Sequence, residues 1–209
     1  SALWLSAEDE HGRVFTNTET YGGFPDPHFF PGPLPEIGQI PTQEDVLNFN
    51  TIFKVTSSDI LAHIDDAQDG TIDHPQKSIY GWPAVGNEHF EDIHGFQPNF
   101  GPEGGAHFIE LPGSENGIYE PHLGEYPHVE SLTKDVVPGE ITWVVYNTAH
   151  NQNMKYGIDS SLVLEIQQTS YAFDCDDAIL KTTIFHDYKV ISRSKVHFPK
   201  FHFGLWMDP

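Results

Sequence analysis

Proline most constrains what this chain can fold into. Six of its 16 prolines lie between residues 22 and 42, a stretch that also contains several glycines. Proline fixes the backbone angle φ and removes a hydrogen-bond donor, so this stretch can be neither a helix nor a central strand. We expect an extended surface loop here, held down by Phe24, Phe29 and Phe30. Together with 18 glycines, the prolines indicate a protein of strands and turns.

The C-terminal third has the patterns of β-strands. Strands are predicted over residues 141–147, 162–173, 181–194 and 196–207. In the second, Leu162, Leu164 and Ile166 alternate with Glu165 and Gln167, which predicts one apolar and one polar face. The third has mixed patterning, which fits a strand covered on both faces. Long neighbouring antiparallel strands are typical of sandwiches. The predicted fold class is therefore mainly β: an antiparallel β-sandwich-like domain with long Pro/Gly-rich N-terminal loops and one short helix.

Two local signals stand out in the N-terminal half. Residues 2–5 and 14–18 flank a turn at 9–12 and predict a hairpin. Thr56, with Asp59 three residues later, resembles a capping box and predicts a helix over 57–66. We expect a single β-rich domain over residues 1–209. Its parts are the hairpin and extended loops (1–55), the helix and acidic loops (56–130) and a strand-rich core (131–209).

The charge of the chain excludes several kinds of partner. Acidic residues outnumber Lys and Arg by 31 to 10, a formal net charge of −21. This charge repels nucleic acids and anionic membranes and attracts divalent cations. Cys175 is the only cysteine, so no intrachain disulfide can form. No apolar run is long enough to cross a membrane, and membrane insertion is not expected. The start at Ser1 resembles a mature exported protein.

Two acidic, glycine-containing loops are the candidate metal sites. Clustered carboxylate, amide and hydroxyl oxygens around a glycine turn suit Ca²⁺. Aligned with an EF-hand loop, the first matches at Asp65, Asp69, Gly70 and Asp73, but it lacks the bidentate Glu at the twelfth position. The alternative is a turn in which the Asp side chains cap backbone amides. The candidate ligands of the two loops are Asp65, Asp66, Asp69, Thr71 and Asp73, and then Glu110, Ser114, Asn116, Ile118 and Glu120.

Aromatic and histidine side chains offer further candidates. Tyr80, Trp82 and Tyr119 lie in predicted loops, where they could stack on a carbohydrate, whereas Trp143 and Trp206 are expected in the core. The 13 histidines are scattered without the spacing of a zinc-binding helix, and we expect ordinary surface or hydrogen-bonded roles. No nucleophile elbow, HExxH motif or Walker loop is present, so no catalytic residues are assigned.

A series of short motifs runs through nearly the whole chain in one order. They lie at residues 3–5, 30–34, 53–56, 63–64, 70–75, 81–83, 86–87, 116–121, 124–127, 164–167, 172–173 and 203–209. The series resembles the N-terminal region of large Bacteroidota surface proteins that carry a C-terminal type IX secretion sorting domain. The resemblance implies export across the outer membrane and display or release at the cell surface. It implies no particular activity.

These observations favour a non-enzymatic extracellular or cell-surface module. Its expected role is structural or adhesive, with Ca²⁺ ordering the two acidic loops and with self-association or binding to other surface proteins by strand addition. The alternative is a carbohydrate-binding module that uses the loop aromatics. A glycan hydrolase is the third interpretation, and it would need a cleft with two facing carboxylates.

Overall fold

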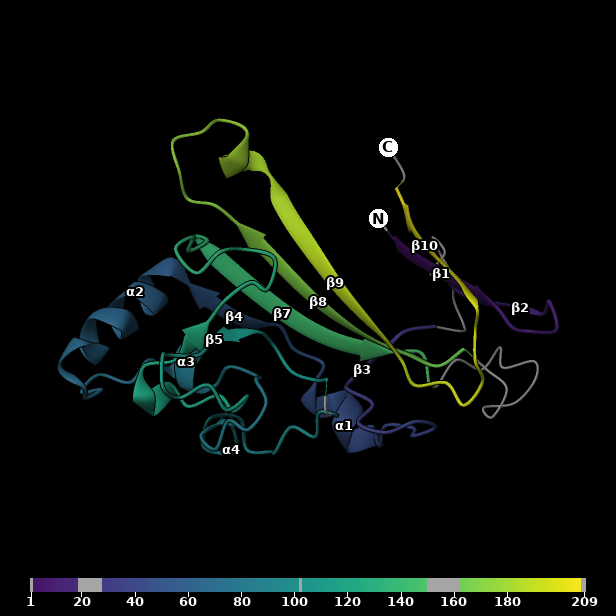
Figure 1. Cartoon of the computed structure of the whole chain (residues 1–209), viewed down its shortest axis with the longest axis horizontal. Helices are drawn as coiled ribbons and strands as arrows, with labels where there is room; N and C mark the ends of the chain where they lie inside the picture. Colours follow the sequence, from purple (N-terminus) through teal and green to yellow (C-terminus); the bar gives the residue numbers. More distant parts are fainter. Residues whose placement is uncertain (1, 19–27, 102, 150–161, 208–209) are drawn as a thin grey trace. The chain divides into compact units, whose positions relative to one another are not determined.

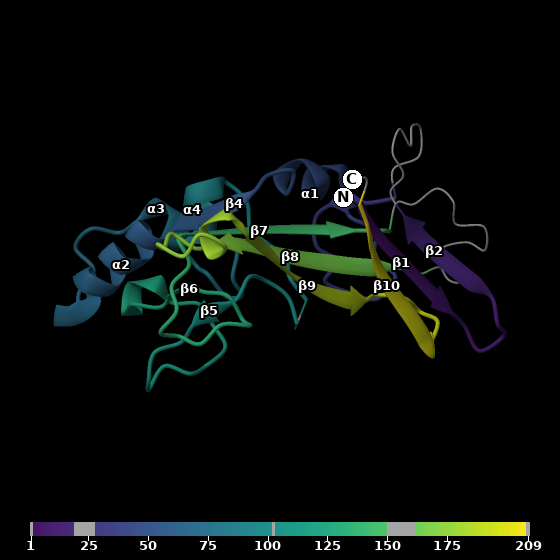
Figure 2. The same ribbon diagram turned by 90° about the horizontal axis from the view of Figure 1, so that it is seen from above.

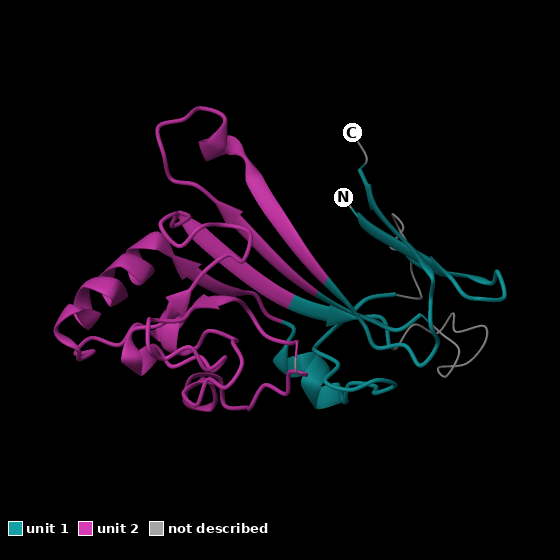
Figure 3. Ribbon diagram, in the orientation of Figure 1, with its two compact units in different colours: residues 1–50, 145–166, 190–209 teal, residues 51–144, 167–189 magenta. Residues whose placement is uncertain are grey.

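A computed structural model describes residues 2–18, 28–101, 103–149 and 162–207. Residues 22–27 of the predicted extended loop, including Phe24, lie outside the described residues. The chain divides into two compact units, each assembled from separate segments (Figure 3). Unit 1 comprises residues 1–50, 145–166 and 190–209, and unit 2 comprises 51–144 and 167–189.

Unit 1 contains the predicted N-terminal hairpin. Strands β1 (Ala2–Glu8) and β2 (Val14–Thr18) pair antiparallel, and β10 (Lys200–Trp206) pairs with the other edge of β1. The order β10-β1-β2 thus joins the two ends of the chain (Figure 1). Asp9 closes the hairpin, because its Oδ1 accepts hydrogen bonds from the amides of His11 and Arg13, both at 2.9 Å. The unit also holds β3 (Phe30–Pro31) and α1 (Gln43–Asn48).

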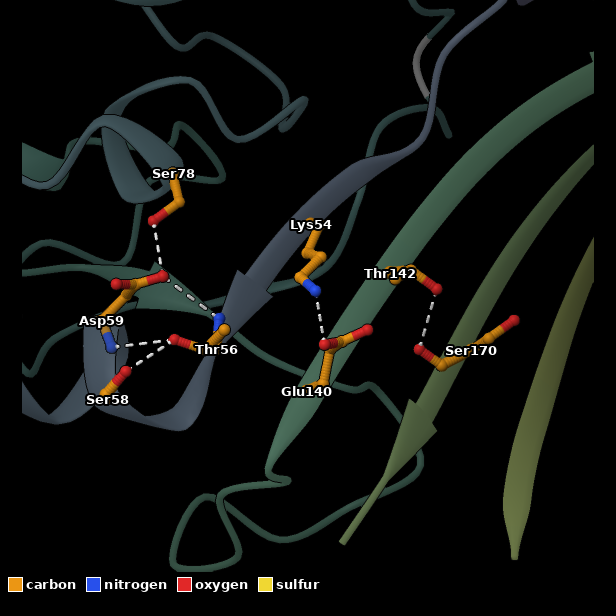
Figure 4. Close-up of polar contacts among 8 residues, drawn as sticks. All are labelled: Lys54, Thr56, Ser58, Asp59, Ser78, Glu140, Thr142 and Ser170. Carbon is orange, nitrogen blue, oxygen red and sulfur yellow. Dashed lines mark hydrogen bonds and ion pairs between the residues drawn. The ribbon is translucent and has the colours of Figure 1, made fainter. Parts of the chain in front are cut away.

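Unit 2 contains most of the helical residues and the acidic loops. Its elements in chain order are β4 (Phe53–Thr56), α2 (Ser57–Asp66), η1 (Ala67–Asp69), α3 (Lys77–Tyr80), α4 (Phe90–His94), β5 (Phe108–Ile109), η2 (Pro121–Leu123) and β6 (Tyr126–Pro127). The predicted capping box of α2 is present, with Thr56 and Asp59 each accepting a hydrogen bond from the other's amide (Figure 4). Asp59 also accepts a hydrogen bond from Ser78.

Three long strands contribute residues to both units. They are β7 (Glu140–Asn147), β8 (Leu164–Ala172) and β9 (Ile184–Ser192). The short helix η4 (Leu180–Thr182) lies between β8 and β9. The strand order is β3-β7-β8-β9, and β4 pairs with β7. Strands β7, β8 and β9 lie side by side in Figure 2. Two contacts within unit 2 tie these strands (Figure 4): Lys54 Nζ lies 2.6 Å from Glu140 Oε2, and Thr142 donates to the Ser170 carbonyl.

The protein is mainly β, with antiparallel sheets and few helices, as predicted and as a β-sandwich-like domain requires. In unit 1, Leu34, Ala149 and Val163 form a buried cluster. In unit 2, Trp143 is buried as expected and lies 6.0 Å from the ring of Phe53. Among the described residues, no helix has the length and apolar character needed to cross a membrane.

The structure corrects three predictions about burial. Glu165 and Gln167, expected on a polar face of β8, are both buried. Glu165 is buried because it accepts a hydrogen bond from the Leu34 amide at 2.7 Å and lies 3.6 Å from Arg193. Strand β9 is not covered on both faces, since none of its residues is buried and Ile184 is 65% exposed. Trp206, expected in the core, lies on edge strand β10, only partly buried and stacked against Trp4.

Candidate functional site

The first acidic loop follows directly from the end of α2, and its carboxylates bind local donors. Asp69 Oδ1 accepts hydrogen bonds from the Thr71 hydroxyl at 2.7 Å and the Thr71 amide at 3.0 Å. These two bonds lower the pKa of Asp69. Asp66 accepts a hydrogen bond from the His74 amide at 2.7 Å, and Asp65 accepts one from the Gln68 side chain at 3.1 Å.

The first acidic loop therefore has the geometry of the alternative to calcium binding, a turn in which Asp side chains cap backbone amides. Gly70, with φ of 87°, ends η1 in the left-handed conformation that glycine adopts readily. Asp73 is exposed. Within the described part of the chain, no three acidic or histidine side chains of this loop bring ligand atoms within 4.8 Å of one another. Calcium binding here stays a prediction.

The second acidic loop is organised around a buried carboxylate. Glu125 is fully buried, and it accepts hydrogen bonds from the Ser114 hydroxyl at 2.9 Å and the Glu120 amide at 2.7 Å. Sequence reasoning did not assign Glu125 to the loop. Glu125 lies in the run 124–129, which is buried throughout the structure, and this burial cannot be read from the sequence.

The other predicted ligands of the second loop bond mainly to the loop itself. Glu110 accepts a hydrogen bond from the Gly117 amide at 2.7 Å. Asn116 donates to Glu120 at 2.8 Å and accepts from the Ile118 amide at 2.8 Å. The loop is thus held by its own hydrogen bonds, and whether Ca²⁺ adds to them also stays a prediction.

The aromatic residues predicted to bind a ligand do not share one exposed surface. Trp82 is 1% exposed and donates from Nε1 to the His107 carbonyl at 3.1 Å. Tyr119 is fully buried, its hydroxyl donates to the Ile79 carbonyl at 3.0 Å, and burial raises its pKa well above the ordinary value. Only Tyr80 is partly exposed. The expected exposure of Trp82 and Tyr119 is therefore not observed, because both rings belong to the core of unit 2.

Three side chains that the sequence did not single out meet on unit 2. Glu88 and His89 precede α4, and His122 lies in η2. Their ligand atoms all lie within 4.8 Å of one another. Glu88 Oε1 is 3.6 Å from His89 Nε2 and 3.8 Å from His122 Nδ1. The histidines are 33 positions apart in the chain, so no spacing rule for a single helix could find them.

The two histidine rings of this Glu88/His89/His122 cluster contact neighbouring rings. The His89 ring lies 4.8 Å from the ring of Tyr80 and 5.6 Å from that of His122. The side chains of Glu88, His122 and His89 are 70%, 40% and 28% exposed, so the cluster can be reached from solvent. Two imidazoles and a carboxylate are a donor set suited to zinc and related ions.

No protein-family model matches this chain, and neither a curated protein nor a solved structure matches it.

Proposed function

We propose that this chain is a non-enzymatic structural or adhesive module of the cell surface or extracellular medium, and that it self-associates by pairing strand β10 with β10 of a second copy. The resemblance to type IX-secreted surface proteins supports the location. The exposed apolar side chains of edge strand β10 support the mode of association, and this is the observation on which the proposal rests.

Strand β10 is an edge with an open apolar side. Among the described residues, β10 pairs only with β1. Leu205, Phe203 and Phe201 stand opposite Leu3, Leu5 and Ala7 of β1 and share a face with them. The three β1 residues are buried, at 8%, 0% and 1% exposure, whereas the three on β10 are 54%, 46% and 43% exposed. The apolar face that is covered at β1 is therefore open at β10.

Such an edge favours strand addition. An unpaired strand edge presents a row of N–H and C=O groups, and proteins usually protect it with charges, proline or a bulge. Across its seven residues β10 carries a single lysine, Lys200, and no proline. Two antiparallel copies of β10 would continue the sheet across a two-fold axis and cover both open apolar edges.

A cavity beside the edge adds room for partner side chains. It has a volume of about 460 Å³ and lies within unit 1. Leu162, Leu164, Val196 and Phe198 line it, together with Phe201 of β10 itself. In strand addition, main-chain hydrogen bonds provide affinity and such pockets provide specificity.

The test is the oligomeric state of matched variants. Leu205→Lys places a charge on the β10 edge, and Val14→Lys places one on β2, the opposite edge of the same sheet, where Val14 is 63% exposed. In sedimentation velocity over a range of concentrations, we expect the wild type and Val14→Lys to dimerise and Leu205→Lys to remain monomeric. A monomeric wild type, or a dimer lost only in Val14→Lys, would overturn pairing through β10.

Calcium is a second part of the proposal. The exposed acids of residues 65–73 carry like charges that Ca²⁺ would neutralise, and oxygen donors are the ligands that this ion prefers. In that role the ion would stabilise the loop rather than take part in chemistry.

A further inference from the structure

We propose that Glu88, His89 and His122 form a binding site for a divalent transition-metal ion, with zinc as the ion of best fit. This site is separate from the two acidic loops predicted to bind calcium, and the proposal does not depend on self-association. Its ligands would be Glu88 Oε1, His89 Nε2 and His122 Nδ1.

The separations of these atoms are close to those of a zinc site. Zinc–ligand bonds of about 2.0–2.2 Å place tetrahedral ligand atoms roughly 3.3–3.6 Å apart. The two distances from Glu88 Oε1 are 3.6 and 3.8 Å. Because the side chains of Glu88 and His122 are 70% and 40% exposed, small rotations of them can close the remaining gap without disturbing the core.

His89 provides an independent indication of a ligand. Its Nε2 atom is buried yet has no hydrogen-bond partner among the described residues. Buried polar atoms nearly always have a partner, and one without a partner needs an explanation. A metal ion bound between His89, Glu88 and His122 would satisfy this nitrogen.

The backbone that carries Glu88 and His89 is anchored to buried groups. Asn87 is 3% exposed, and its side chain donates to the carbonyls of Tyr80 and Trp82, both at 2.8 Å. Its Oδ1 accepts a hydrogen bond from the His89 amide at 3.0 Å. A binding site works best when its ligands start from rigidly held positions, and Asn87 supplies that support here.

The segment that carries His122 is anchored as well. Helix η2 is preceded by Glu120, whose amide donates to the buried Glu125, and it ends at Gly124 with φ of 97°. Residues with a side chain rarely adopt this φ, and a Cβ at Gly124 would lie 3.0 Å from Ala67 Cβ, so the position favours glycine. The two segments thus present their side chains from fixed backbone.

The donor set selects the class of ion. Ca²⁺ and Mg²⁺ prefer oxygen ligands, whereas imidazole nitrogen suits zinc, copper and nickel. Three protein ligands leave a fourth position for water or another donor, as in open zinc sites. Glu88 also lines a pocket of about 200 Å³ with Val85, Gln97 and Phe100, so this pocket adjoins the cluster at its carboxylate.

The experiment is a titration of the metal-free protein with ZnCl₂ by calorimetry, with CaCl₂ in parallel. Three variants remove ligands: Glu88→Gln, His89→Gln and His122→Gln. The matched control is His74→Gln, because His74 is an exposed histidine 3.5 Å from a carboxylate, Asp66, outside any described cluster of three ligands. Circular dichroism checks that each variant folds.

We expect one zinc ion per chain, no competition from calcium, and a loss of affinity of at least about tenfold in each ligand variant, since even residues outside the ligand set change metal affinity by about 10–100-fold. His74→Gln should bind zinc like the wild type. Substituted Co²⁺ should give the visible spectrum of a low-coordinate site, and His122→Gln should lose it. Zinc binding that is weak, multiple and equal in the wild type and the ligand variants would overturn the proposal.

Discussion

At the scale of single residues, buried histidines make the stability of the folded state depend on pH. His63 lies on α2 with no exposed surface, and its Nε2 is 3.1 Å from the Glu125 carbonyl. Burial lowers the pKa of His63 below its ordinary value, against the opposing effects of that carbonyl and of the Asp66 carboxylate. Burial also lowers the pKa of His107. Both histidines are therefore more easily protonated in the unfolded chain.

This difference predicts that acid destabilises unit 2. The unfolded state binds more protons, so the contribution of His63 is complete above about pH 6.5 and is lost as pH falls through the lower pKa of the folded state. Each such proton changes the free energy of unfolding by at most about 1.4 kcal/mol per pH unit. Urea unfolding at pH 7 and pH 5 should show a smaller pH dependence in His63→Gln than in the wild type. The exposed His74→Gln serves as the control, and an equal pH dependence in His63→Gln would contradict the prediction.

At the scale of elements, local sequence signals predicted local structure well. The capping box at Thr56 and Asp59 identified α2 with its observed ends, and the turn at residues 9–12 identified the β1–β2 hairpin. Both signals act within a few residues, so they are readable in the sequence. Burial was harder to predict, because it depends on distant partners. The buried carboxylate of Glu165, for example, accepts a hydrogen bond from the amide of Leu34, which lies 131 positions away in the chain.

The candidate sites show the same contrast between local signals, which the sequence carries, and contacts between distant segments, which it does not. For the first acidic loop, the sequence named the turn-capping alternative that the hydrogen bonds of Asp69 and Asp66 resemble. It did not find the Glu88/His89/His122 cluster, because two segments far apart in the chain must fold before those atoms meet. The sequence also failed to predict the burial of the aromatic residues. Trp82 and Tyr119 were predicted in loops, whereas both are buried in the core.

The first acidic loop supplies a prediction about calcium. If Ca²⁺ binds at residues 65–73, it stabilises the folded state by mass action, by about 2.7 kcal/mol at a free concentration 100 times the Kd. We expect EDTA to lower the melting temperature and to speed protease cleavage near these residues. Asp69→Asn, which weakens any ion site while retaining an acceptor for Thr71, should abolish the response to calcium. The same melting curve in EDTA and in calcium would remove this part of the proposal.

At the scale of the whole molecule, the division into two units was not readable from the sequence. The sequence predicted contiguous parts with boundaries near residues 55 and 130, whereas unit 1 is assembled from three separate segments. Pairing such as Ala2 with Trp206 determines which segments share a unit. No local pattern encodes a pairing across the whole chain, so it emerges only when the sheet forms.

The net charge predicts how self-association depends on salt. Two copies that each carry −21 repel one another at low ionic strength. Salt shortens the range of this repulsion, from roughly 30 Å at 0.01 M to about 8 Å at 0.15 M. The apolar contact proposed for β10 is not weakened by screening, so the dissociation constant of the dimer should fall as NaCl is raised over this range, as measured by sedimentation equilibrium. Leu205→Lys should remain monomeric at every salt concentration, which separates a β10 contact from general salting-out. Association that weakens with salt would instead mean that ion pairs hold the copies together, and pairing through an open apolar edge would then be the wrong description of the contact.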